Sequence, residues 1–176
     1  MIFIVARYIE LFLLLLLSLI SDCKDYRIKN TIVYPFIAAG LVTNLCIGGF
    51  RGLAFSLLAT LVPVFILFLL YSLKMLGAGD IKLFASIGSI MGTKFALLSI
   101  VYSFLLGGLI ALIIICFRKN WNKRLEYFLR YIKSCFLTLS LLPYTNLKDT
   151  SDGAKFRFSY ATVLGVLATF IFYLQQ

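Results

Sequence analysis

The sequence predicts an all-α fold, a polytopic membrane bundle of six transmembrane helices with one amphipathic helix on the cytoplasmic surface. Hydrophobic residues make up 62% of its 176 residues, against about 45–50% in soluble domains. They come in runs long enough to cross a membrane rather than in short alternating stretches. The net charge of +10 is explained in so apolar a chain by basic cytoplasmic loops, so no nucleic-acid partner is expected.

Six apolar runs are the predicted spans, and together they suggest a single membrane-embedded domain over residues 1–176. They cover residues 2–20, 31–47, 53–71, 81–91, 95–117 and 158–174. The first run is too long for a signal-peptide core and is expected to be retained. It contains Arg7 and Glu10 at a spacing that allows them to pair. Gly88 and Gly92 form a GxxxG pair that predicts a helix-packing face.

The segment between the fifth and sixth runs is amphipathic instead. Large apolar residues recur at helical spacing with basic residues between them, which predicts a helix lying on the membrane surface. These are Trp121, Leu125, Phe128, Ile132, Phe136 and Leu139. The apolar stretch 135–144, interrupted by Pro143, is too short to span a membrane.

The distribution of basic residues predicts the orientation of the bundle. With both termini outside, three basic residues lie outside, namely Arg7, Arg51 and Lys94. The other fourteen of the 17 lie inside: Lys24, Arg27, Lys29, Lys74, Lys82, Arg118, Lys119, Lys123, Arg124, Arg130, Lys133, Lys148, Lys155 and Arg157. This bias agrees with the excess of Lys and Arg in cytoplasmic loops.

Two acids then fall at the same cytoplasmic boundary. Asp22 directly follows the first run and Asp80 directly precedes the fourth. Asp22 could simply be a solvated helix end, and Asp80 an N-cap of the next helix. However, Gly77 and Gly79 remove side chains just before Asp80 and allow close backbone approach or a positive φ, as an extended peptide substrate would need.

Two neighbouring carboxylates suit peptide hydrolysis. Such a pair tends to share one proton, so that one acid activates water while the other protonates the scissile carbonyl. The sequence has no His, which excludes Ser-His and Cys-His mechanisms. Its four cysteines form no CxxC pair, so neither a metal nor another cofactor is expected. The alternative is a transporter that uses the acids as an ion or proton relay, which would place them nearer mid-membrane.

Three stretches resemble the prepilin peptidase family of GxGD aspartyl proteases. Residues 77–92 match its GxGDxK motif and the apolar helix after it, residues 22–30 its first acidic motif, and residues 158–165 the start of its last helix. The resemblance implies that Asp22 and Asp80 are catalytic. It gives Gly77, Gly79 and Lys82 supporting or substrate-binding roles. Lys82 would stabilise the charge of Asp80, or else reach toward the membrane surface as a snorkelling lysine.

The chain departs from the family pattern at two places. Lys29 stands where the family usually has proline, and the cysteine-rich insert of the long members is absent. The absent insert indicates a short form with peptidase activity alone. Asp25 is the alternative first acid, but the spacing to Arg27, Ile28 and Asn30 favours Asp22.

The resemblance also implies a substrate and a location. The substrate would be a type IV pilin or pseudopilin precursor, cut just before its hydrophobic helix. The enzyme would lie in a bacterial, or alternatively an archaeal, cytoplasmic membrane with its active site on the cytoplasmic side. Basic loops would there contact anionic lipids.

Overall fold

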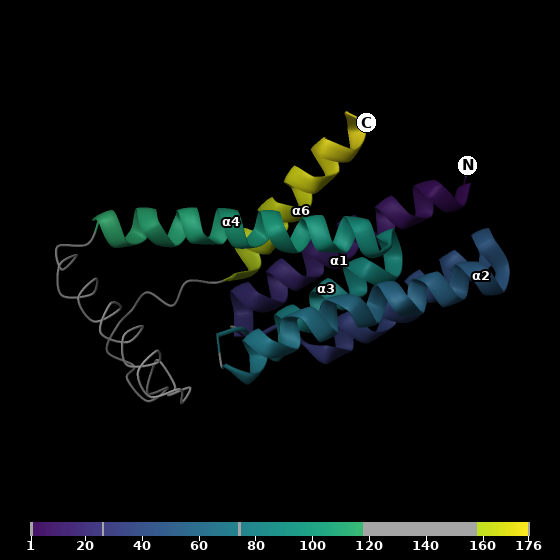
Figure 1. Cartoon of the computed structure of the whole chain (residues 1–176), viewed down its shortest axis with the longest axis horizontal. Coiled ribbons are helices and arrows are strands. Elements are labelled where there is room, and N and C mark those ends of the chain that lie inside the picture. Colours follow the sequence, from purple (N-terminus) through teal and green to yellow (C-terminus); the bar gives the residue numbers. More distant parts are fainter. Residues whose placement is uncertain (1, 26, 74, 118–157, 176) are drawn as a thin grey trace. The chain divides into compact units, whose positions relative to one another are not determined.

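The computed structural model describes residues 2–25, 27–73, 75–117 and 158–175, and the regular structure in these ranges is helical. The helices are α1 (Ile2–Asp25), α2 (Asn30–Ser72), α3 (Ala78–Met91), α4 (Thr93–Phe117) and α6 (Phe158–Leu174) (Figure 1). The predicted interfacial helix around Trp121 and the stretch 135–144 lie outside the described residues. The chain divides into two compact units, residues 1–107 with 157–176 and residues 108–156. The second is described only where it continues α4.

Helix α2 contains two of the predicted runs and doubles back between them (Figure 1). Gly49 has φ 58° and ψ −146°, which breaks the helix and which glycine adopts at little cost. A Cβ at Gly52 would lie 2.1 Å from the carbonyl oxygen of Asn44, so the arms pack closely beside the bend. The arms, residues 30–48 and 50–72, are about 28 and 34 Å long at 1.5 Å per residue. A hydrocarbon core about 30 Å thick matches both lengths.

Two described helices are long and apolar enough to cross a membrane, namely Asn30–Ser72 and Thr93–Ile114. The apolar helix Phe158–Tyr173 is shorter. The all-helical prediction is therefore confirmed for the described residues, while the count of six spans stays a prediction.

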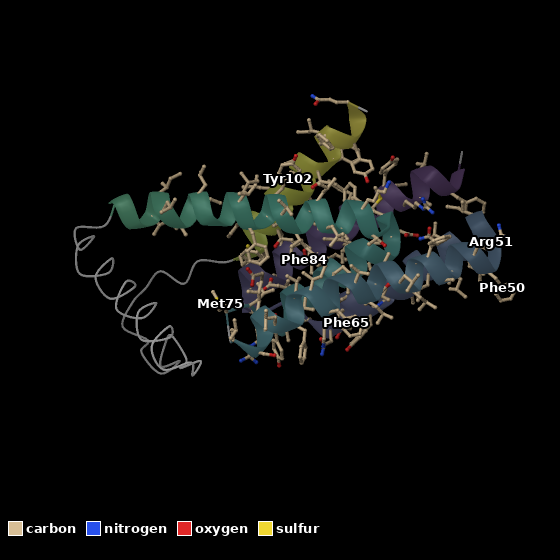
Figure 2. The ribbon with its side chains drawn as sticks, in the orientation of Figure 1. Phe50, Arg51, Phe65, Met75, Phe84 and Tyr102 are labelled. Carbon is tan, nitrogen blue, oxygen red and sulfur yellow. The ribbon has the colours of Figure 1, made fainter. Side chains whose placement is uncertain are left out.

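Helix α3 forms the centre of the larger unit. Ile81 and every residue from Leu83 to Ile90 are buried. A Cβ at Gly88 would lie 2.0 Å from the carbonyl oxygen of Ala59 in the second arm of α2, which confirms Gly88 as a packing position. Figure 2 shows Phe84 of α3 inside the unit, whereas Phe65 of α2 projects outward, and their exposed fractions are 0% and 75%.

The C-terminal end of α3 is capped by a side chain of α2. Asn44 donates from Nδ2 to the carbonyl oxygen of Ser89 at 2.7 Å and accepts from Arg7 at Oδ1. Carbonyls at a helix end need such donors where water is absent. The predicted pairing of Arg7 with Glu10 is wrong, because Glu10 instead accepts from Thr43 at 2.6 Å. Arg7 and Glu10, the two charged residues inside the apolar part of α1, are therefore both bonded to α2.

Gly92 separates α3 from α4. Its φ of 94° breaks the helix after Met91, and a Cβ there would meet nothing within 4 Å among the described residues. The expectation that Gly92 lies on a packing face is therefore wrong. Only Gly88 of the GxxxG pair packs against a neighbouring helix, while Gly92 supplies a backbone conformation that L-residues rarely adopt.

Candidate active site

Asp22 lies inside a helix rather than beyond one. The sequence predicts that the first span ends before Asp22, but α1 continues to Asp25. The polar residues 22–25 extend the helix past its apolar part, and Lys24 in the last turn favours this through the helix dipole. Asp22 is half-buried, whereas Asp25 is exposed. The last turn of α1 therefore holds Asp22 at the edge of the packed helices.

Ser21 shapes the link that follows α1, of which residues 27–29 are described. Its hydroxyl donates to the carbonyl oxygen of Arg27 at 2.9 Å and accepts from the amide of Lys29 at 3.3 Å. These two bonds fold the link back over the end of α1. Ile28, between them, reaches Gly79, where an added Cβ would lie 3.2 Å from the Cβ of Ile28. The link beside Asp22 thus packs directly on the first turn of α3.

Asp80 lies at the third position of α3. The N-cap is Gly77, so the alternative of an Asp80 N-cap is wrong. The carboxylate instead accepts a hydrogen bond from the backbone N–H of Gly77, one turn back. An acid at this position commonly bonds the N-cap amide and favours the helix dipole. This folds the side chain of Asp80 over the start of its own helix.

The glycines before Asp80 make room for its carboxylate and for the link. A Cβ at Gly77 would lie 3.2 Å from Oδ2 of Asp80. Gly77 has φ −76° and ψ 146°, an extended conformation open to any residue. Space rather than a positive φ therefore explains glycine at this position, and Gly79 is explained by its contact with Ile28.

The charge of Asp22 acts on Asp80. Asp80 precedes the apolar run of α3 and lies outside the predicted span. Burial, and then the negative charge of Asp22, raise the pKa of Asp80 from 3.8 to about 6, while the hydrogen bond from Gly77 lowers it. A buried carboxyl beside a second acid resists ionisation in this way. The structure thus brings together the two acids that the sequence selected.

Lys82 bonds Asn30 and makes no ion pair with Asp80 among the described residues. Its ammonium donates to Oδ1 of Asn30 at 2.8 Å and lies 5.2 Å from the centre of the Tyr34 ring. It therefore joins the start of α3 to the start of α2. Asp25 forms an ion pair of 2.6 Å with Lys29. Asp25, the alternative first acid, is therefore engaged in an exposed ion pair outside the packed site.

Sequence reasoning missed Ser159 as a site residue. Its hydroxyl, in the first turn of α6, donates to Oδ2 of Asp22 at 2.5 Å. Next to it, the hydroxyl of Tyr160 lies 3.2 Å from the thiol of Cys23. The resemblance at residues 158–165 pointed to the start of this helix, but it did not indicate which residue Ser159 contacts. Two adjacent side chains of α6 therefore contact two adjacent side chains of α1.

The described residues contain no group of three or more His, Cys, Asp or Glu side chains that could hold a metal ion. What they do hold is a pair of carboxylates in an all-helical, strongly apolar framework. Two interacting acids of this kind can share one proton, so that one can act as an acid and the other as a base.

Comparison with protein families gives the class of the protein. Residues 9–112 match the model of the type IV leader peptidase family, so the chain belongs to that family. It is therefore a membrane protein of a protease family associated with type IV pili, which does not favour the transporter alternative. The comparisons with curated proteins and with solved structures each found no match. The matched stretch contains Asp22, Gly77, Gly79, Asp80 and Lys82.

Proposed function

We propose that the chain is an aspartyl endopeptidase of the GxGD type, which removes the short cytoplasmic leader of type IV pilin or pseudopilin precursors. Asp22 and Asp80 are its catalytic acids. The observation that carries this proposal is the environment of Asp80. Its carboxyl is held over the first turn of α3, and burial and the charge of Asp22 raise its pKa to about 6. A pair of this kind holds one proton ready for catalysis.

The reaction needs only the two acids and water. Asp80 is the protonated partner because its environment opposes ionisation, so Asp22 is the base. Asp22 takes a proton from water as the oxygen attacks the scissile carbonyl carbon, and Asp80 gives its proton to the carbonyl oxygen. When the tetrahedral intermediate breaks the C–N bond, the proton on Asp22 moves to the leaving nitrogen. The carboxyl of Asp80 recovers its proton as the new acid forms.

The proposed location follows from the charge distribution. Six spans with both termini outside place Asp22 and Asp80 at the cytoplasmic boundary. A precursor anchored by its own apolar helix would present its leader at that depth. The basic loops would contact anionic lipid head groups, because pilin leaders are themselves usually basic.

Co-expression with a type IV pilin precursor tests this function. Loss of the leader shifts the precursor on a gel and should require the intact chain. D22N and D80N should each abolish the shift while the protein still accumulates in the membrane. Each amide keeps the shape of the side chain but cannot exchange a proton. Full processing by either variant would disprove the proposed mechanism.

Asp25 provides the matched control. It lies on the same helix turn but is exposed and paired with Lys29. D25N should therefore process the precursor at a rate close to that of the wild type, because exposed ion pairs contribute little to stability. If D25N is inactive and D22N is active, Asp25 is the first acid and our assignment is wrong.

A further inference from the structure

We propose that Ser159 is a positioning residue that fixes the carboxylate of Asp22 for catalysis. The inference rests on the proposed function, since it concerns how one of the two acids is held. Ser159 has an exposed fraction of 2%, and its hydroxyl donates to Oδ2 of Asp22 at 2.5 Å. It lies outside the stretch that matches the family model, which ends at residue 112. The last described helix thus contributes directly to the site.

The direction of this hydrogen bond is unusual among the described helix hydroxyls. Most of them donate to a carbonyl oxygen one turn back in their own helix, as in Ser86, Ser103, Thr60, Thr162 and Thr169. Such back-bonds satisfy the hydroxyl locally and do not depend on a neighbouring helix. Ser159 instead bonds a carboxylate on another helix, as Thr43 of α2 does with Glu10 of α1, and Asp22 lies 137 residues away from Ser159 in sequence. Its hydroxyl therefore links the first turn of α6 to the last turn of α1.

The bond also has an electrostatic reason. Asp22 lies in the last turn of α1, where the helix dipole disfavours a negative charge. The first turn of α6 offers the opposite end of a dipole, and a hydroxyl donor to a carboxylate is a strong hydrogen bond. Ser159 thereby stabilises the charged form of Asp22, which is the form that accepts a proton from water. Its bond engages Oδ2 of that carboxylate.

A second contact holds the same two helix ends. Tyr160 and Cys23 lie 3.2 Å apart, next to the Ser159–Asp22 pair, on the exposed side. Farther along α6, a Cβ at Gly165 would lie 2.2 Å from the hydroxyl oxygen of Ser103 in α4. Packing along α6 therefore does not depend on Ser159 alone. Removing its hydroxyl should affect Asp22 more than it affects the fold.

The test compares S159A with T162V in the full-length protein, using a purified type IV pilin precursor as substrate. Thr162 is fully buried one turn further along α6 and bonds only the carbonyl oxygen of Phe158, so T162V is the matched loss of a buried hydroxyl. We expect S159A to lower kcat about tenfold to a hundredfold with KM within about twofold of the wild type. T162V should change neither, and S159T, which keeps the hydroxyl, should recover most of the activity.

The thermal midpoint separates positioning from a merely structural role. A displaced Asp22 carboxylate should lower kcat in a protein whose thermal midpoint is unchanged, whereas a damaged fold should lower both together. A fall in activity that only follows a lower thermal midpoint would overturn the inference.

Two further outcomes have definite meanings. S159A that behaves like T162V would show that Ser159 does not position Asp22, while inactive D22N and D80N would still support the proposed function. Active D22N would instead overturn the proposed function itself. If S159A does not accumulate in the membrane, S159C replaces it, since its thiol is close in size and a weaker donor. S159C should then show intermediate activity, and wild-type activity would contradict the inference.

Discussion

Gly79 of α3 and Ile28 of the α1–α2 link are in direct contact next to Asp80. An added Cβ at Gly79 would lie 3.2 Å from the Cβ of Ile28 and 3.5 Å from its backbone nitrogen and oxygen. Ile28 belongs to the link that Ser21 folds over the end of α1, and Gly79 directly precedes Asp80. The distance between Asp22 and Asp80 thus depends on how closely this link approaches α3.

G79A should therefore lower peptidase activity about tenfold while the protein still folds. The new methyl group pushes the link away by a few tenths of an ångström, and catalytic geometry is sensitive to shifts of that order. Cleavage of a pilin precursor by purified protein measures the effect. G108A is the control, since a Cβ there meets no described residue within 4 Å. Equal activity of both variants would show that the contact with Ile28 does not set the site geometry.

The activity should fall as the pH rises through about 6. The pKa of Asp80 is raised to about 6, and the proposed mechanism needs its carboxyl protonated. Above that pH both acids become charged and no proton is left for the scissile carbonyl. The kcat/KM of the purified protein between pH 4 and 9 measures this limb. A rate that keeps rising through pH 8 would contradict the assignment of Asp80 as the acid.

The same pKa predicts that D80N is more stable than the wild type at pH 7. A carboxyl whose pKa rises from 3.8 to about 6 on folding makes the protein lose stability as the pH increases through this window. The loss amounts to at most about 3 kcal/mol, and the neutral amide avoids it. Thermal midpoints in detergent at pH 4 and pH 7 should therefore differ less in D80N than in the wild type. Identical differences would argue against a buried, ionising Asp80.

N44L should destabilise the protein without touching the acids. Asn44 donates to the carbonyl oxygen of Ser89 and accepts from Arg7, and leucine leaves both groups without this partner. We expect a loss of about 2 kcal/mol, since unsatisfied polar groups inside a bundle are costly while bonds within membranes are individually modest. Thermal unfolding in detergent measures this. L45A, at the more exposed adjacent position, is the control. An equal loss of stability in L45A would contradict the capping role of Asn44.

Reporter fusions test the predicted topology. Fusions after Lys119 and Thr150 should report a cytoplasmic location, and fusions after Gly49 and Gln176 an external one, because basic loops stay inside. An external reporter at Thr150 would mean that the stretch 135–144 crosses the membrane. A cytoplasmic reporter at Gly49 would invert the whole chain and place the acids on the wrong side for a cytoplasmic leader.

The helices could be predicted well from local patterns, with instructive errors at their ends. The break at Gly49 falls between the second and third predicted spans, because an apolar run interrupted by adjacent glycines favours a turn there. The apolar pattern predicts an end of α1 that is too early. Hydropathy marks where apolar residues stop, whereas the helix continues until its backbone hydrogen bonds have no further partners, at Asp25.

The sequence by itself determined the all-helical class, and it selected Asp22, Asp80 and the glycines before Asp80 as candidates for the site. Each of these depends on composition or on short spacings within one segment. Only the tertiary structure decided that Gly79 meets Ile28, that Lys82 bonds Asn30, and that the charge of Asp22 acts on Asp80. It also decided that Ser159 donates a hydrogen bond to Asp22, 137 residues away in the chain. Such contacts depend on how separate helices pack, and no local pattern carries that information.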